Sequence, residues 1–171
     1  MERNGEYANE NAPPASRMDL MEYDCTAEQL ALNHVRLCDQ RESPVLARPG
    51  YSENIHILRT SATDLLGALQ NAIANFIFEL RGNGIPSNMI LTPQVFNRRS
   101  RTVTRVSKVL WGSNRFVGCA TQLCGSFYFT SCMYRNPVNV VGQSIYNIGA
   151  VCSACPTGPN NCNFSHWLCS Y

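Results

Sequence analysis

Apolar side chains recur at helical spacing near the start of the chain. Leu30, His34 and Leu37 follow one another at intervals of four and three residues, which predicts an amphipathic helix over residues 27–38. Within that pattern, His34 is expected to be a satisfied core histidine rather than a metal ligand. The preceding residues 1–17 are polar and carry a Pro-Pro pair, so they are expected to form an extended lead-in.

A second helical pattern follows a long polar segment. Residues 39–60 contain two prolines and a glycine, which predicts a loop. A helix is then expected from Ser61, because Ser61 and Asp64 resemble a capping box, and the glycines at positions 82 and 84 end it. Its expected apolar face comprises Leu65, Leu69, Ile73, Phe76 and Leu80.

The later part of the chain favours strands. After an expected loop at residues 85–104, apolar or alternating segments predict strands at residues 106–111, 116–120 and 127–132. There are no internal repeats, and the length suits one compact domain with a real core.

Four of the nine cysteines form a cluster near the end of the chain, with the spacing C-x2-C-x6-C-x6-C. This tail is rich in Gly, Pro and Asn and has too few apolar residues for a core of its own, so disulfides are expected to hold it together. A structural zinc site is the alternative, but the spacing lacks the paired knuckles of a zinc ribbon. The four residues are Cys152, Cys155, Cys162 and Cys169.

Composition narrows the class of protein. The high cysteine content predicts a secreted protein, and no apolar run approaches the roughly 20 residues that cross a bilayer. The net charge of +2 conceals an asymmetry, because all 12 acidic residues lie at or before Glu79. Residues 1–79 hold six arginines against those acids, a net charge of −6, whereas residues 80–171 carry seven arginines and one lysine, a net charge of +8.

Three polar features are candidates for function. Glu79 follows Phe76 by three positions on the predicted apolar face, where a carboxylate is costly unless it is paired or metal-bound; an exposed helix-end residue is the alternative. Asn163 begins the only glycosylation sequon. A basic run suits heparin, nucleic acid or an acidic protein surface, although such a run is more often a solvated loop and secretion argues against nucleic acid. The run contains Arg98, Arg99, Arg101, Arg105 and Lys108.

Six segments, in this order, carry a resemblance to a known family: APPASRM (12–18), MEYDCTAE (21–28), SENI (52–55), VLWGSNRFVGCA (109–120), CMYRNPVNVVG (132–142) and IYNIGAVCSAC (145–155). Together they resemble the CAP superfamily of cysteine-rich secretory, antigen 5 and pathogenesis-related proteins. The similarity is strongest to the activation-associated secreted proteins of parasitic nematodes, which include hookworm integrin antagonists. The resemblance implies an α/β fold, a three-layer α-β-α sandwich with a central antiparallel sheet. Residues 1–150 would form the CAP domain, lacking its first helix, and residues 151–171 a cysteine-rich tail.

The resemblance also implies a cleft with two glutamates and two histidines, which binds zinc in some members. Glu53 and Glu79 match the two glutamates, whereas Arg105 stands at one histidine position and Glu42 falls near the other. Arginine stays protonated and offers no lone pair to a metal. We therefore expect no metal, no cofactor and no catalytic residues, with Arg105 pairing both carboxylates in place of zinc.

The odd number of cysteines follows from the same resemblance. An N-terminal segment with a tenth cysteine is expected to be absent, which leaves one thiol without its partner. Cys119 and Cys132 flank a predicted strand pair and are expected to bond, and the tail is expected to form two bridges. Cys25, Cys38 and Cys124 then supply one more bridge and the free thiol, with the choice among them open.

The expected function is a secreted, non-enzymatic interaction between a parasite and its host. The partner would be a host cell-surface protein, with a platelet or leukocyte integrin as the leading candidate, and contact would come from loops. The alternative implied by the resemblance is a sterol or lipid carrier, which needs an apolar pocket rather than a charged surface.

Overall fold

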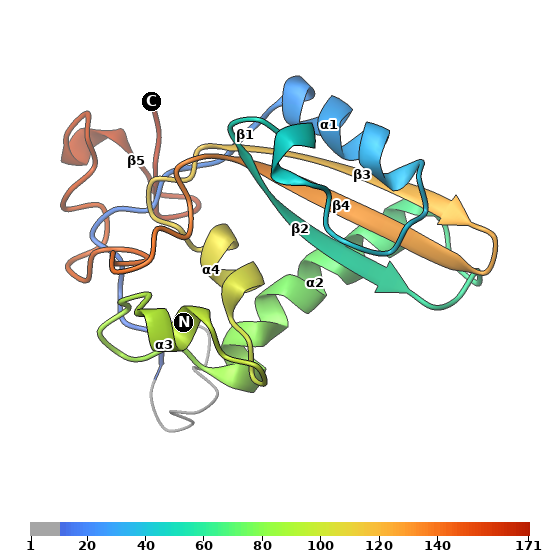
Figure 1. Ribbon diagram of the computed structural model, residues 1–171. Helices are drawn as coiled ribbons and strands as arrows, with labels where there is room; N and C mark the ends of the chain where they lie inside the picture. Colours follow the sequence, from blue (N-terminus) through green and yellow to red (C-terminus); the bar gives the residue numbers. More distant parts are fainter. Residues whose placement is uncertain (1–10) are drawn as a thin grey trace. The chain divides into compact units, whose positions relative to one another are not determined.

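The structure is a computed structural model that describes residues 11–171 and divides the chain into two compact units (Figure 1). Unit 1 contains the N-terminal residues up to Leu20, Ile77–Arg115 and Val138–Tyr171, and unit 2 contains Met21–Phe76 and Phe116–Pro137. In chain order the elements are β1 (Glu22–Tyr23), α1 (Cys25–Val35), η2 (Val45–Ala47), β2 (Tyr51–Leu58), α2 (Leu65–Asn83), α3 (Pro93–Phe96), α4 (Thr104–Val109), β3 (Phe116–Cys124), β4 (Phe127–Arg135), η3 (Pro159–Asn161), β5 (Cys162–Asn163) and β6 (Leu168–Cys169).

Unit 2 is built around a four-stranded sheet in the order β1-β3-β4-β2. The long strands β2, β4 and β3 pair antiparallel, as expected, but the two-residue β1 pairs parallel with β3, so the sheet is mixed. The predicted strands at 116–120 and 127–132 are present and extend further, to Cys124 and Arg135. The predicted loop at residues 39–60 is wrong in part, because it contains β2.

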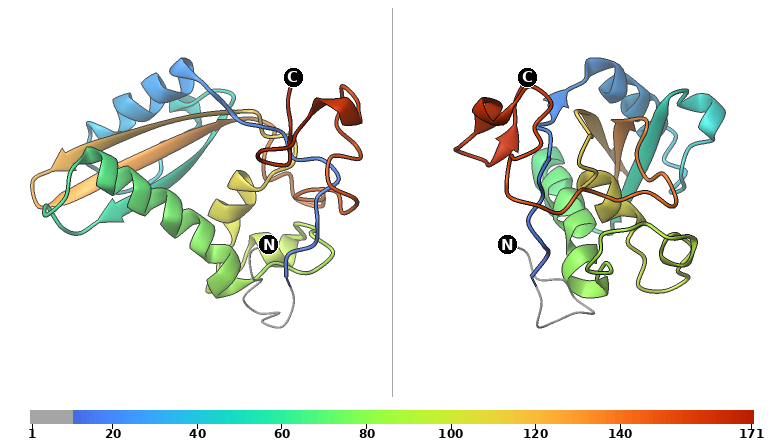
Figure 2. Two further views of the ribbon diagram at one scale, coloured as in Figure 1. Left: turned by 180° about the vertical axis from the view of Figure 1, so that it is seen from behind. Right: turned by 90° about the vertical axis from the view of Figure 1, so that its left-hand side faces the viewer.

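Two helices cover the two faces of this sheet, which gives the α-β-α sandwich (Figure 2). On one face, Ala27 and Ala31 of α1 pack against Met133 of β4. Gly118 of β3 makes this approach possible, because a Cβ there would lie 2.2 Å from the Glu28 nitrogen. On the other face, α2 contacts β2 through His56, whose ring meets Phe76 edge-on and whose Nε2 lies 2.8 Å from the Asn71 side chain.

The helix ends differ from those predicted, because other residues cap them. Asp24 caps α1 by accepting hydrogen bonds from the Thr26 and Ala27 amides, so this helix begins at Cys25 and ends at Val35. Burial opposes ionisation of Asp24, but the hydrogen bonds it accepts hold the pKa of its carboxyl below the ordinary value. For α2, Asp64 rather than Ser61 accepts from the first turn, through the Gly67 amide at 2.7 Å.

The buried face of α2 also differs from the predicted one. It consists of Ala68, Ala72, Phe76 and Leu80, whereas Leu65 and Ile73 are exposed. The expected apolar face is therefore confirmed at Phe76 and Leu80 and wrong at Leu65 and Ile73, because Ala68 and Ala72 are buried in the N-terminal part of the helix instead. Glu79 nevertheless lies on the buried side, which excludes an exposed helix-end position.

Two short helices in unit 1 occupy segments that were predicted otherwise. Residues 106–111 were expected to be a strand but contribute instead to α4 and the turn after it. The expected loop at 85–104 contains α3, which Thr92 caps through the Val95 amide. No helix within residues 11–171 is long and apolar enough to cross a membrane.

Four disulfides are present, two in each unit. Unit 2 contains Cys38–Cys124 and Cys119–Cys132, and unit 1 contains Cys152–Cys162 and Cys155–Cys169. The pairing of Cys119 with Cys132 and the two bridges of the tail are the expected ones. The free thiol is Cys25, which is exposed.

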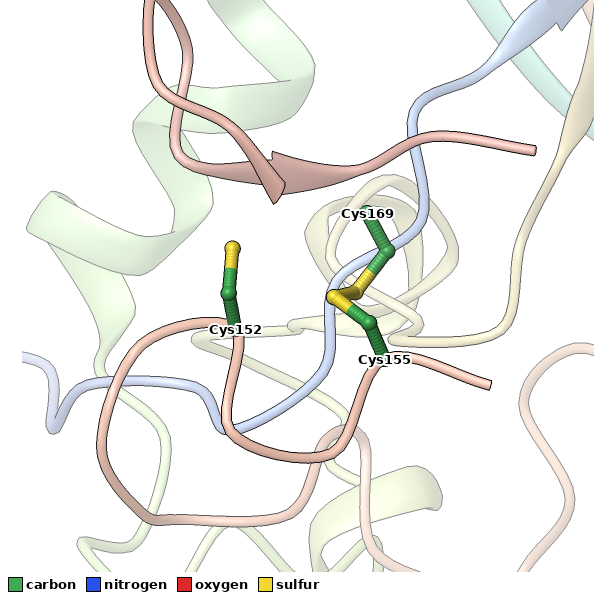
Figure 3. Close-up of side chains that lie close together, drawn as sticks. All are labelled: Cys152, Cys155 and Cys169. Carbon is green, nitrogen blue, oxygen red and sulfur yellow. A yellow bond between two sulfur atoms is a disulfide. The ribbon is translucent and has the colours of Figure 1, made fainter. Parts of the chain in front are cut away.

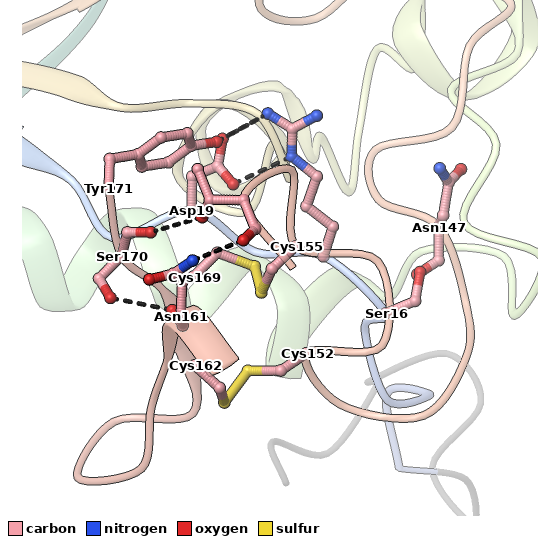
Figure 4. The surroundings of a disulfide bond; sticks show 12 residues. Ser16, Asp19, Asn147, Cys152, Cys155, Asn161, Cys162, Cys169, Ser170 and Tyr171 are labelled. Atoms are coloured by element: carbon pink, nitrogen blue, oxygen red, sulfur yellow. Dashed lines mark hydrogen bonds and ion pairs between the residues drawn. A yellow bond between two sulfur atoms is a disulfide. The ribbon is translucent and has the colours of Figure 1, made fainter. Parts of the chain in front are cut away.

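Disulfides hold the tail of unit 1 together, and backbone hydrogen bonds fix it to the lead-in (Figure 4). Cys169 donates to the Met18 carbonyl, and its own carbonyl accepts from Leu20. Three tail sulfurs, those of Cys152, Cys155 and Cys169, lie within 4.8 Å of one another (Figure 3). Each of them is already bonded in a disulfide, so they are not thiolates that could bind zinc.

Candidate functional site

Glu53 lies on β2 in unit 2, on the sheet face that meets α1. The register places Glu53 opposite Met133 and Ile55 opposite Ser131, so the Glu53 and Ser131 side chains share this face as diagonal neighbours. Only 1% of Glu53 is exposed to solvent. A carboxylate in this position must find its hydrogen-bond donors within the protein.

Those donors come from three other segments of unit 2. The Ser131 hydroxyl donates to one carboxylate oxygen at 2.7 Å, and His34 of α1 contacts the same oxygen through Nδ1. Ser43 donates to the second oxygen twice, from its amide at 2.8 Å and from its hydroxyl at 2.6 Å. The Arg48 guanidinium lies 3.7 Å from that second oxygen.

His34 is buried between two acidic side chains. Its Nδ1 meets Glu53, and its Nε2 lies 3.1 Å from Asp39, which is partly exposed. Ionised carboxylates accept hydrogen bonds but cannot donate them, so both contacts form together only when the ring carries two protons. The Phe129 ring packs edge-on against the imidazole. His34 is thus a satisfied core histidine, and it connects α1 to β2.

Glu42, the fourth expected cleft residue, does not share this environment. Its side chain is 58% exposed, and it lies 3.9 Å from the Arg48 guanidinium. It is therefore a surface carboxylate of unit 2 that forms at most a weak, solvent-screened ion pair.

Glu79 lies in unit 1, near the C-terminal end of α2, and is as deeply buried as Glu53. One of its oxygens accepts from the backbone amides of Arg105 at 2.9 Å and Val106 at 3.0 Å. These amides belong to the first turn of α4, where helix N–H groups have no partner within the helix. The N-cap residue Val103 provides no side-chain acceptor. Glu79 therefore acts as the cap of α4 from a distant part of the sequence.

The second oxygen of Glu79 is occupied by side chains. The Arg105 Nε donates to it at 2.6 Å, and the Thr102 hydroxyl lies 3.4 Å away. The expected pairing of Arg105 with Glu79 is therefore present. The carboxylate at position 53 has a different set of partners, so the hypothesis that Arg105 pairs both glutamates is wrong for Glu53.

The side chains at these positions do not fit a metal ion. A carboxylate has about four acceptor positions, and each of the two glutamates meets four N–H or O–H groups within 3.5 Å. A metal at either carboxylate would have to displace these donors. Arg105 adds a permanent cation, which repels a metal and cannot ligate it.

Several residues of this arrangement were not identified from the sequence. Ser43, Arg48 and Ser131 satisfy Glu53, but serine and arginine carry no signal of their own at isolated positions. One local sign was available: Ser43 directly follows Glu42, in the segment that was matched to a histidine of the family.

The expected glycosylation sequon lies at the β5–β6 hairpin of unit 1. The Asn163 Oδ1 accepts from the Ser165 amide at 3.0 Å, and the intervening Phe164 is exposed. Phe164 and Trp167 meet edge-on beside it. Glycosylation of Asn163 remains a prediction.

The comparisons with known proteins agree with this fold. The model of the CAP family, described as the cysteine-rich secretory protein family, matches residues 3–134. The Ancylostoma secreted protein of Ancylostoma caninum is 32% identical over 94% of this chain, and Hookworm platelet inhibitor 1 of the same organism is 28% identical over 82%. The chain spans 38% and 62% of the lengths of these two relatives.

Solved structures show the same similarity. A crystal structure of NaASP2 with Zn2+ is 31% identical, has a TM-score of 0.89, and is matched over 99% of this chain and 84% of that one. A crystal structure of hookworm platelet inhibitor is 25% identical with a TM-score of 0.63, over 91% of this chain and 78% of that one.

Proposed function

The chain belongs to the CAP family of cysteine-rich secretory proteins, and we propose that it is a secreted, non-enzymatic protein that antagonises a receptor on host cells. Two similar proteins come from a hookworm, and one of them is named as a platelet inhibitor. A platelet or leukocyte integrin, which the family resemblance implies, is the leading candidate for the receptor. Four disulfides suit the oxidising environment outside the cell.

The saturation of the two buried glutamates is the observation that supports a non-enzymatic role. General acid–base catalysis needs a carboxyl group that can reach a substrate proton, and metal catalysis needs ligands with available lone pairs. Glu53 and Glu79 direct their lone pairs to protein donors instead, and Arg105 cannot act as a base. These residues hold α1, α4 and the sheet strands in place. We therefore expect the receptor to bind at the protein surface.

The recognition mode proposed here does not use an Arg-Gly-Asp loop. The nearest sequence is Arg81-Gly82-Asn83, which forms the last turn of α2 and lacks the aspartate. We expect the receptor to contact surface loops of the protein instead.

The test is binding of the purified protein to a panel of immobilised platelet and leukocyte integrins, with platelet and neutrophil adhesion measured in parallel. The proposal expects saturable binding to at least one integrin and a matching block of adhesion. Failure to bind any integrin, together with unchanged adhesion, would exclude this receptor class.

A sterol or lipid carrier is the second candidate, and an apolar groove in unit 1 favours it. The groove has a volume of about 340 Å3. Its lining includes Leu80, Leu110, Val151, Trp167 and Leu168. A sterol-binding assay run beside the integrin panel discriminates the two functions, because Leu110→Glu would weaken sterol binding and leave integrin binding unchanged.

A further inference from the structure

Three exposed apolar side chains lie in unit 2, just after α1 and on η2. Leu46 is 95% exposed, Val45 is 69% exposed and Leu37 is 68% exposed. Val45 and Leu46 belong to η2, which buries none of its residues, and the segment that leads to η2 runs back along α1 (Figure 1). Single exposed aliphatic residues are common on protein surfaces, but several gathered in one place indicate a binding surface.

These three side chains surround a cavity of about 210 Å3 that lies within unit 2. Leu37 lines the cavity, and so do Pro44 and Ala47, which stand on either side of Val45 and Leu46 in the sequence. A cavity of about 150 Å3 with an apolar lining holds a benzene ring, whereas pockets for drug-sized ligands begin at about 300 Å3. The cavity therefore has room for one aromatic or branched aliphatic side chain.

The segment that forms one wall of the cavity is fixed to the sheet by the groups around Glu53. Ser43 donates to Glu53 from its amide at 2.8 Å and from its hydroxyl at 2.6 Å, and the Arg48 Nε donates to the Ser43 carbonyl at 3.3 Å. The disulfide of Cys38 with Cys124 ties the beginning of the segment to β3. A surface that is ordered before binding loses little conformational entropy on association.

The charged residues beside these apolar side chains are balanced in sign. Residues 36–43 contain Arg36 and Arg41 together with Asp39 and Glu42, a net charge of zero. Attachment to an anionic lipid surface is strengthened by basic residues around the inserted apolar ones, and this segment has no excess of them. An apolar centre with a rim of mixed charge is instead the usual composition of a protein–protein interface.

We propose that Leu37, Val45 and Leu46 form the surface that contacts a protein receptor, and that the receptor inserts one aromatic or branched aliphatic side chain into the cavity. The inference rests on the receptor role proposed above and names the surface for it. Met133, which is buried and lines the cavity, favours an aromatic ring through its thioether. The Arg41 side chain is 81% exposed and meets Asp39 only at 3.5 Å, so it can also donate to a carboxylate beside the inserted side chain.

The first test compares two double variants of the full chain in the integrin panel, after circular dichroism has shown that both are folded. Val45→Ser/Leu46→Ser removes the centre of the surface and is expected to weaken binding by about thirtyfold or more. The matched control is Leu65→Ser/Leu66→Ser, which removes two exposed leucines of α2 in the same unit and should change binding by less than about twofold. Equal losses in the two variants would overturn the proposal.

The second test does not depend on the identity of the receptor. The N-acetyl amides of phenylalanine, leucine and serine are titrated into the protein while the NMR signal of the Met133 methyl group is followed. The phenylalanine and leucine amides should shift this signal with dissociation constants on the order of 1–10 mM, and the serine amide should not. Ala47→Phe places a ring at the cavity and should abolish these shifts.

The two tests separate this proposal from the choice of an integrin. Shifts of the Met133 signal without binding to any integrin would support the site and exclude that receptor class. A Met133 signal that none of the amides shifts would overturn the site. Binding to phosphatidylserine vesicles that Val45→Ser/Leu46→Ser abolishes would assign the surface to a membrane and overturn the proposal. A dimer that the same variant abolishes would assign it to a second copy of the chain instead.

Discussion

Glu53 in unit 2 and Glu79 in unit 1 are equally buried but are satisfied by different chemistry. Glu53 is surrounded by serine hydroxyls, a histidine and a backbone amide, with Arg48 at a longer distance. Glu79 pairs closely with Arg105 and caps α4 through two backbone amides. Glu53 thus connects segments that are distant in sequence, whereas Glu79 caps the first turn of α4.

Protein donors surround both glutamates that the family resemblance assigned to the cleft. The carboxylates at both positions are present, yet the donors around each one leave no lone pair for a metal. Glu79 in unit 1 pairs with a permanent cation, Arg105, whereas most of the groups that donate to Glu53 in unit 2 are neutral. Removing either carboxylate is therefore expected to affect stability first, and by different amounts.

The largest effect is expected for Glu53→Ala. Its removal leaves His34, Ser43 and Ser131 without their acceptor in a buried site, which should lower the free energy of unfolding by about 3–5 kcal/mol. Urea denaturation followed by circular dichroism measures this. The control is Glu42→Ala, an exposed carboxylate of the same unit, whose expected effect is within about 0.5 kcal/mol. Equal effects of the two variants would contradict the account of Glu53.

A smaller effect is expected for Glu79→Gln. The amide keeps one acceptor oxygen but presents N–H groups to donors, so a loss of about 1.5–3 kcal/mol is expected. Hydrogen exchange should also become faster at the Arg105 and Val106 amides, because their acceptor is weakened. Unchanged exchange at these two amides would show that Glu79 does not cap α4.

The smallest effect is expected for Arg105→Gln. The arginine side chain is 34% exposed, so solvent screens its pairing with Glu79 and a loss of about 1 kcal/mol or less is expected. This loss should shrink as NaCl rises from about 0.05 to about 0.5 M, whereas the loss caused by Glu53→Ala should not. A salt-independent effect of Arg105→Gln would mean that the ion pair is not what stabilises Glu79.

The secondary-structure predictions failed where contacts with residues distant in sequence determine the local structure. The β-branched segment beginning at Val106 resembled a strand, but Glu79, 27 positions earlier, accepts from its amides and stabilises a helix there. The strand β2 was not predicted, because the prolines and the glycine just before it indicated a loop. Its pairing with β4 joins residues up to 84 positions apart. The strands β3 and β4 were predictable because they are neighbours in sequence and pair through a short turn.

The residues of the site also differ in how far they could be predicted from the sequence. The buried position of Glu79 could be inferred from its place three residues after Phe76, and its pairing with Arg105 from the family pattern. The partners of Glu53 could not, because Ser131 reaches it from a strand 78 positions away and Ser43 from an irregular loop. Sequence patterns identify buried acids more readily than the neutral donors that satisfy them.

Calorimetric titration of zinc into the disulfide-intact protein tests the saturation of the two glutamates most directly. With both carboxylates engaged by protein donors and Arg105 present, no saturable heat of binding is expected at micromolar concentrations of zinc. Binding of one zinc ion with micromolar or tighter affinity, abolished in Glu53→Ala or Glu79→Gln, would contradict the account.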